Sequence, residues 1–319
     1  MIFENKIVSM YKGMMHTRYD DEETVFYFRP ENFPGLKVEP YSFKSVLGHK
    51  LYGWFYEYDN ARRDRLVVFE HGLGGGHLAY MKEIEKLCSH GFRVFSYDHT
   101  GCMRSEGKST NGLSQSLSDL NDCIASLKAD GYFEGCEVSV MGHSWGAFAT
   151  MNISAIYPEI KRVVAMSGFV SVKDMIDSFF PGIMKPYRKP IYELEKSANP
   201  YFVKFNSAES LKKSNAKALL IYSENDNICK RAHYDILNEA LRESENVKLL
   251  LVKNKGHNPN YTEEAVNCLG EFFEAKTKLA KQKSLTEEEK KKFVSSFDWE
   301  KMTEQDESVW QVIFEHLDN

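Results

Sequence analysis

The chain has 319 residues, of which 42% are hydrophobic and 27% charged, and its formal net charge is −5. This composition is typical of a folded globular protein, and the acidic balance argues against a nucleic-acid partner, because phosphate binding needs a concentrated basic face. No apolar run reaches the roughly 18–20 residues that cross a bilayer, so we expect no stable membrane insertion.

The N-terminal segment and the cysteines indicate a cytoplasmic protein. Glu4 and Lys6 interrupt what would be the apolar part of a signal peptide. The six cysteines are scattered and include no Cys-x-x-Cys pair, as expected for reduced thiols. We treat residues 1–40 as an extension that precedes the main domain.

Eight short runs predict the strands of a sheet. Aromatic and β-branched residues alternate with polar ones at residues 36–43 and 50–59, as in half-buried strands. The six runs that follow are mostly apolar, which suits strands buried on both faces of a parallel sheet. They occupy residues 66–72, 92–99, 137–144, 162–169, 218–226 and 247–257.

Segments with helical spacing lie between these runs, notably at residues 116–130 and 231–244. Strands that alternate with helices imply right-handed crossovers and a sheet covered on both faces. We therefore predict one α/β domain, with its core at residues 41–170 and 216–278. The predicted buried helix faces consist of Leu117, Leu120, Ile124 and Leu127 in the first segment and Ile236, Leu237 and Leu241 in the second.

Two segments interrupt this alternation. Residues 171–215 form an overlong, aromatic-rich connection, and connections of this length are usually lids or other functional insertions. The tail, residues 279–319, is predicted to be helical, with Thr286 and Glu289 spaced as a capping box. We expect its apolar stripe to pack on the main domain, with a homodimer contact as the alternative. The stripe consists of Trp310, Ile313, Phe314 and Leu317.

The stretch Gly142–Gly146, of sequence GHSWG, lies between a predicted strand and an apolar segment that reads as a helix. A strand that turns sharply into a helix strains the turning residue, and glycines two positions before and after it relieve the clash. The hydroxyl is then held above the sheet edge, over a helix N-terminus. In this context we predict that Ser144 is a nucleophile rather than part of an ordinary turn.

A serine nucleophile needs a general base, which an acid must orient. In this architecture the chain order is Ser, then Asp or Glu, then His, at the C-terminal ends of later strands. One predicted strand ends at Glu224 and Asp226, and the next ends at His257. We predict His257 as the base and Asp226, which closes the turn, as the acid, with Glu224 as the alternative.

The glycine-rich stretch His71–His77 follows another predicted strand. A tetrahedral intermediate needs two preorganised backbone N–H groups, and we predict them at Leu73, in this stretch, and at Trp145. A phosphate-binding loop does not fit, because no Gly-Lys-Ser/Thr follows. We expect no metal and no cofactor, since the nearby histidines and Asp98 lack a recognised ligand spacing. These histidines are His71, His77 and His99.

These residues resemble the α/β-hydrolase fold superfamily, in particular the lid-bearing branch of serine aminopeptidase-like and monoacylglycerol-lipase-like enzymes. The likeness covers about residues 41–278 and rests on HGLGG, GHSWG, the Asp226 turn and the KGH that ends at His257. It implies an eight-stranded, mostly parallel sheet with helices on both faces and a helical lid after the sixth strand. One departure is Met103, where such proteins often carry glycine; we expect Met103 to line the pocket or the loop to take another path.

The first functional interpretation is a serine hydrolase that cleaves small-molecule carboxylic esters of small to medium apolar acyl groups, through an acyl-enzyme intermediate. Two alternatives stay open: an amide or peptide hydrolase of the serine aminopeptidase-like type, and a non-catalytic binding protein with a degenerate site. Glu193 and Glu195 could hold a substrate amine, but we interpret this pair as solvated surface. We expect an apolar acyl pocket shaped by the insertion. Its candidate lining residues are Met103, Phe169, Phe179, Phe180, Met184 and Tyr187.

Overall fold

A computed structural model describes residues 2–282 and 284–319. One eight-stranded sheet has the order β1-β2-β4-β3-β5-β6-β7-β8, in which β2 is antiparallel to β1 and β4 and the other neighbours are parallel. The predicted α/β sheet is therefore confirmed. The strands are β1 Lys37–Lys44, β2 Lys50–Glu57, β3 Arg65–Glu70, β4 Arg93–Tyr97, β5 Glu137–His143, β6 Arg162–Met166, β7 Lys217–Ser223 and β8 Val247–Val252.

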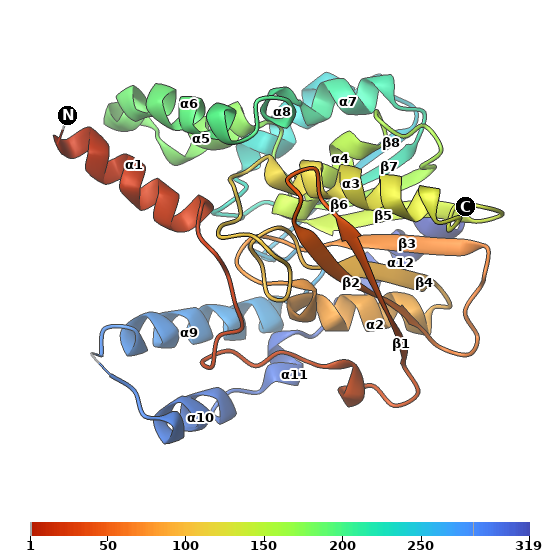
Figure 1. Cartoon of the computed structure of the whole chain (residues 1–319), viewed down its shortest axis with the longest axis horizontal. Coiled ribbons are helices and arrows are strands. Elements are labelled where there is room, and N and C mark those ends of the chain that lie inside the picture. The colour runs from red at the N-terminus through yellow and green to blue at the C-terminus, as the bar shows by residue number, and fades with distance from the viewer. Residues whose placement is uncertain (1, 283) are drawn as a thin grey trace.

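Helices cover both faces of the sheet, with α3, α4 and α8 on one face and α2 and α12 on the other (Figure 1). None of the described helices is both long and apolar enough to cross a membrane. The α-helices are α1 Ile2–Met15, α2 Met81–Ser89, α3 Gln115–Ala129, α4 Trp145–Ile153, α5 Val172–Phe179, α6 Arg188–Ala198, α7 Ser207–Lys213, α8 Arg231–Leu241, α9 Glu263–Leu279, α10 Glu287–Ser295, α11 Trp299–Met302 and α12 Glu307–Asp318. Shorter 3₁₀ turns are η1 Pro30–Asn32, η2 His77–Tyr80, η3 Gly182–Tyr187 and η4 Phe202–Lys204.

The helical periodicity of the sequence matches the buried helix faces with one exception. All four apolar residues predicted for the buried face of α3 are fully buried. In α8, Leu237 and Leu241 are buried, but the prediction is wrong for Ile236, which is 42% exposed. Consecutive helical residues point about 100° apart, so Ile236 lies at the edge of the face that Leu237 buries.

The C-terminal tail packs on the main domain of the same chain. Trp310, Ile313 and Leu317 of α12 are fully buried, and they join the apolar core formed by α2 and one face of the sheet. Phe314 is partly buried and stacks on His90, with ring centroids 3.7 Å apart. The predicted capping box at the start of α10 is also present.

The extension before the main domain begins with α1, which lies beside the long connection between β6 and β7 (Figure 1). The part of the extension that follows α1 contacts the tail, where Phe26 packs near Trp299 with ring centroids 5.8 Å apart. The β6–β7 connection, the insertion (residues 171–215), folds into α5, η3, α6, η4 and α7. Figure 1 shows α1 alongside α5 and α6, and α1 contacts α6 and η3. Two segments that are distant in the sequence therefore form one flank of the molecule.

Asn260, in the loop that follows β8, joins a buried carboxylate of α2 to the tail. Glu83 of α2 is 1% exposed, and Asn260 Nδ2 donates to Glu83 Oε1 over 3.1 Å and to Gln305 Oε1 over 2.8 Å. Burial raises the pKa of Glu83 from its ordinary value of 4.5 to about 7, because a carboxylate loses hydration there.

This pKa predicts how the stability of the fold depends on pH. Because the folded-state pKa of Glu83 is raised, the stability contributed by the protonated side chain is complete below pH 4.5 and is lost as the pH rises through about 7. We expect the thermal midpoint of the wild type to fall by at least about 2–4 °C between roughly pH 5 and pH 8, and Glu83→Gln to remove most of that fall.

Thermal unfolding followed by circular dichroism across this pH range would measure the effect. Glu85→Gln is the matched control, because Glu85 lies on the same helix but is only partly buried. The same dependence on pH in the wild type and both variants would contradict the role of Glu83.

Candidate active site

Ser144 occupies the turn between β5 and α4, with φ 55° and ψ −111°, a conformation that residues other than glycine rarely adopt. The flanking glycines leave no room for a side chain: a Cβ on Gly142 would lie 2.5 Å from Thr150 Oγ1, and one on Gly146 would lie 2.4 Å from Glu70 O. The predicted strand–turn–helix geometry is present, and it presents the Ser144 side chain at the C-terminal edge of the sheet.

His257 and Asp226 lie together at the ends of β8 and β7. His257 Nδ1 is 2.8 Å from Asp226 Oδ2, and the other carboxylate oxygen accepts from the backbone N–H groups of Ile228 and Cys229 over 2.8 and 3.0 Å. The Asp226 side chain is fully buried and that of His257 is 17% exposed. Of the two candidate acids, Asp226 contacts His257, whereas Glu224 is exposed.

The glycine-rich loop passes directly beside Ser144. A Cβ on Gly72 would lie 3.4 Å from Ser144 Cβ, so the loop approaches this residue to van der Waals distance. Leu73 follows Gly72, and Trp145 follows Ser144 in the chain. The two residues predicted as oxyanion donors therefore belong to the two segments that meet at Ser144.

A hydrogen-bond chain connects this loop to the segment that carries His257. The Gly72 N–H donates to the Tyr80 hydroxyl over 3.1 Å, Tyr80 Oη lies 2.8 Å from His143 Nδ1, and His143 Nε2 lies 2.7 Å from His257 O. Burial lowers the pKa of His143 to about 3, so its ring is neutral. Because a carbonyl only accepts, Nε2 carries the proton and Tyr80 donates to Nδ1.

The sequence offered a weak signal for these two connecting residues. His143 is adjacent to Ser144 in the GHSWG motif, so its position could have drawn attention to it. Tyr80 stands eight residues after Gly72, with no pattern that marks it.

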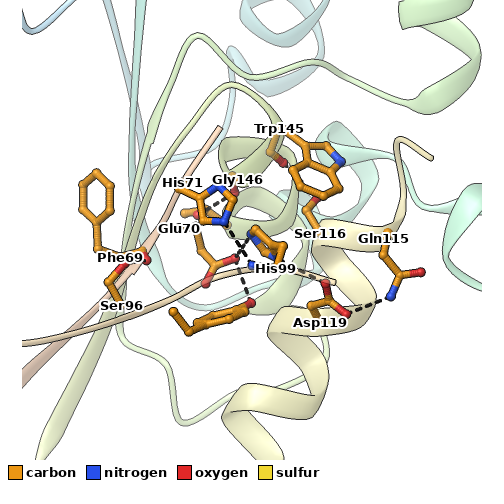
Figure 2. Close-up of polar contacts among 12 residues, drawn as sticks. Phe69, Glu70, His71, Ser96, His99, Gln115, Ser116, Asp119, Trp145 and Gly146 are labelled. Atoms are coloured by element: carbon orange, nitrogen blue, oxygen red, sulfur yellow. Dashed lines mark hydrogen bonds and ion pairs between the residues drawn. The ribbon is translucent and has the colours of Figure 1, made fainter. Parts of the chain in front are cut away.

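A buried charged cluster lies beneath the turn from β5 into α4 at residues 142–146, which we call the elbow (Figure 2). His99 Nε2 is 3.2 Å from Glu70 Oε2 and His99 Nδ1 is 3.3 Å from Asp119 Oδ2, and all three side chains are fully buried. Burial alone would lower the pKa of His99, but the two carboxylates raise it to about 9. Burial raises the pKa of Glu70, and pairing with His99 opposes that shift. His99 is therefore an imidazolium at neutral pH.

Hydrogen bonds of this cluster and of α3 also connect the loop after β4 and α3 to the elbow. Asp119 accepts from the Thr100 N–H, the Thr100 hydroxyl and Gln115 Nε2, each over 2.8 Å. Ser116 Oγ, one turn before Asp119 on α3, donates to Trp145 O over 2.9 Å. Figure 2 shows Gln115, Ser116 and Asp119 on α3, next to His99 and Trp145.

The histidines of the glycine-rich loop form hydrogen bonds to other residues of the same chain. His71 Nε2 accepts from the His99 N–H over 3.0 Å, and His77 Nδ1 lies 2.8 Å from Asp98 Oδ1. Within residues 2–282 and 284–319, the structure shows no group of three or more His, Cys, Asp or Glu that could hold a metal ion.

The structure places the residues predicted to line the acyl pocket in two environments. Phe169 is 1% exposed and lies in the core, stacked on Phe148 with ring centroids 4.5 Å apart. The others from the insertion lie between the end of α5 and η3, and they are partly buried. They are Phe179, Phe180, Met184 and Tyr187.

Met103 adopts the backbone conformation that glycine would favour at this position, with φ 44°. Its side chain is 9% exposed and lies against Gly76, where a Cβ would come within 2.4 Å of Met103 Cγ. The N-terminal extension supports this loop, because Met103 N–H donates to Tyr19 O over 2.7 Å and the Arg18 guanidinium donates to three of its carbonyls.

The interpretation of the two insertion glutamates as solvated surface is wrong for one of them. Glu193 is exposed, with Lys196 Nζ 3.8 Å away. Glu195 is 0% exposed, because α1 and the loop before α3 cover it and supply hydrogen-bond donors. The sequence could not show this, since the covering residues come from distant segments.

Comparison with known proteins gives a family and a fold. A family model described as serine aminopeptidase, S33 matches residues 61–247, more than half of the chain. Proline iminopeptidase of Saccharolobus solfataricus is 25% identical over 191 residues, which are 59% of this chain and 56% of that protein. RutD of Serratia proteamaculans is 30% identical over 104 residues, 32% of this chain and 37% of that protein. The chain thus matches between 37% and 56% of the length of these curated relatives.

The solved structures agree on the fold. Esterase Pf2001 of Pyrococcus furiosus superposes with a TM-score of 0.60 at 21% identity, covering 88% of this chain and 99% of that chain. At this level of identity the likeness shows a shared fold, that of the α/β hydrolases.

The charged cluster beneath the elbow predicts a large effect on stability. His99→Phe would leave Glu70 and Asp119 buried without their cation, and removing one partner of a buried ion pair costs about 3–5 kcal/mol of unfolding free energy. Because the pKa of His99 is raised from 6.5 to about 9, the stability contributed by its charge is complete below pH 6.5 and is lost as the pH rises through 9.

Urea unfolding at neutral pH, with the pH then raised, would test this prediction. His90→Phe is the control, because the His90 side chain is 34% exposed beside Asp318, and exposed pairs contribute only about 0–1 kcal/mol. Equal stability of His99→Phe and His90→Phe would show that the cluster does not stabilise the fold.

Proposed function

The chain belongs to the serine aminopeptidase S33 family and has the α/β-hydrolase fold, and we propose that it is a serine hydrolase of carboxylic esters with small to medium apolar acyl groups. The observation that carries this proposal is the His257–Asp226 contact of 2.8 Å at the same sheet edge as the strained turn at Ser144. A nucleophile, a base and an orienting acid in this chain order are the parts that acyl transfer requires.

The proposed reaction follows from these positions. The Ser144 hydroxyl attacks the acyl carbon while His257 Nε2 takes its proton, and the same proton then passes to the leaving alkoxide. Asp226 accepts the His257 Nδ1–H, which fixes the tautomer and stabilises the imidazolium. The Leu73 and Trp145 N–H groups bind the oxyanion. Water, activated by His257, then hydrolyses the acyl-enzyme.

The state of the insertion glutamates favours an ester over the amide of an amino-terminal substrate. A carboxylate that binds a substrate ammonium must have a free lone pair facing the site. Glu195 is fully buried and accepts hydrogen bonds from Tyr11, His16 and Leu113, so it is already occupied. Glu193 lies on the exposed side of α6 near Lys196.

A second candidate is an amide or peptide hydrolase, which the match to a proline iminopeptidase favours. Parallel assays of nitrophenyl esters and aminoacyl nitroanilides would separate the two. We expect ester turnover to dominate, and it should rise with acyl length until the pocket is full, at about 0.8 kcal/mol per buried methylene. The proposed wall of this pocket includes Met103 and the partly buried side chains of the insertion.

Ser144→Ala should abolish turnover, because His257 then has no hydroxyl to activate. We expect kcat to fall by about 10⁴-fold or more, with little change in thermal midpoint. A fluorophosphonate probe should label the wild type and not the variant. Near-normal ester hydrolysis by the purified variant would remove Ser144 from the mechanism, and an unlabelled, inactive wild type would favour a non-catalytic binding protein.

Asp226→Asn should reduce kcat by about 10³- to 10⁴-fold, since an amide no longer holds the His257 tautomer or its positive charge. Glu224→Gln is the matched control at the same strand end, and its kcat should change by less than about twofold, because Glu224 is exposed. Steady-state kinetics on one nitrophenyl ester measures both. The reverse order of effects would make Glu224 the acid.

A further inference from the structure

We propose that Glu195 is a positioning residue that couples the insertion and the N-terminal helix to the oxyanion donor at Trp145. This inference rests on the proposed hydrolase site, and it assigns a role in catalysis to α1, which lies outside the matched family region.

The two oxygens of Glu195 bind two different segments, the C-terminal end of α1 and the loop before α3. Oε1 accepts from the Tyr11 hydroxyl over 2.8 Å and lies 2.8 Å from His16 Nε2. Oε2 accepts from the Leu113 N–H over 2.7 Å. A carboxylate this deeply buried is retained only where its oxygens are satisfied. One side chain of α6 therefore joins α1 to the loop that precedes α3.

Leu113 also hydrogen-bonds to Trp145, the residue that follows Ser144. Its carbonyl accepts from Trp145 Nε1 over 2.7 Å, so the same residue is held by Glu195 through its N–H and holds the indole through its C=O. Trp145 is 1% exposed, and its backbone N–H is one of the two proposed oxyanion donors. Leu113 is thus the one residue between the Glu195 carboxylate and Trp145 in this series of hydrogen bonds.

The loop before α3 is shaped to receive the carboxylate. Gly112 has φ 93°, and a Cβ there would lie 2.5 Å from Glu195 Oε2, so any other residue would displace the side chain. Gly112 N–H donates to Met15 O over 3.1 Å, and Asn111 Nδ2 donates to Ala198 O, at the end of α6, over 3.3 Å. The N-terminal extension and α6 therefore hold the same short loop.

The N-terminal helix and the insertion are consequently docked as one unit. Tyr11 is 3% exposed and packs near Phe180, with ring centroids 6.3 Å apart, and Figure 1 shows α1 alongside the insertion helices. Tyr11 of α1 and His16, which directly follows α1, make the two hydrogen bonds to Glu195 Oε1, so both bonds require α1 to be in place. If α1 and the insertion separate from the main domain, the Leu113 N–H loses its hydrogen bond to Glu195. The Leu113 carbonyl then no longer fixes the Trp145 indole, and the Trp145 backbone N–H is less firmly positioned.

The test compares Glu195→Gln with Glu193→Gln, a matched control on the exposed side of the same helix. Glu195→Gln keeps the side-chain shape and loses one acceptor oxygen and the charge. We expect its kcat on nitrophenyl butyrate to fall by about tenfold or more, as expected when a catalytic donor loses its preorganised position, with KM nearly unchanged. The thermal midpoint should also fall, because the amide NH2 then faces a buried donor, so kcat is measured well below that midpoint. Glu193→Gln should match the wild type. A purely structural role would lower the thermal midpoint and leave the kcat of the folded enzyme unaltered.

Tyr11→Phe provides a second variant that keeps the ring packing if Glu195→Gln does not fold. Its kcat should fall by about threefold or more, and combining it with Glu195→Gln should add little, because both act through one carboxylate. A folded Glu195→Gln or Tyr11→Phe enzyme with wild-type kcat would overturn the coupling alone. A wild type that neither hydrolyses the ester nor reacts with the fluorophosphonate would overturn both proposals.

Discussion

The chain reverses from β5 into α4 within the single residue Ser144, and this strained turn sets the requirements for the surrounding structure. Gly142 and Gly146 are needed because Thr150 and the backbone of Glu70 occupy the space of a side chain. The Ser144 N–H donates to Met166 O, at the end of the neighbouring strand, over 2.8 Å. A residue with φ 55° persists only where its surroundings determine it so completely.

Buried polar groups around Ser144 hold it in this backbone conformation. The His99 cluster lies under the elbow, and the Tyr80–His143 chain spans from the glycine-rich loop to His257. Burying ions and polar groups costs free energy unless each is paired, so such groups would be unfavourable elsewhere in an apolar core. Here they fix the relative positions of three chain segments that meet at the sheet edge, which is what a preorganised site needs.

The N-terminal extension and the insertion add an outer layer to this arrangement. Arg18 and Tyr19 hold the loop of Met103 in its left-handed turn, and Glu195 holds the loop before α3. Neither contact belongs to the sheet. The first ends on a loop that packs against the glycine-rich loop at Gly76, and the second ends on a loop that hydrogen-bonds to Trp145. The parts of the chain that lie outside the common fold are thus connected to the site by specific polar bonds rather than by apolar contact alone.

The sequence by itself determined the order of the strands and helices, the turn at Ser144, and the positions of Asp226 and His257 at successive strand ends. Such features depend on local periodicity and on the chain order of one sheet, both of which are written along the sequence. The tertiary structure alone decided that Glu195 is buried, that Ile236 is exposed, and that Tyr80 and His143 meet. Each of these depends on segments far apart in the chain, and a local pattern records whether a side chain is apolar but not which distant residue covers it.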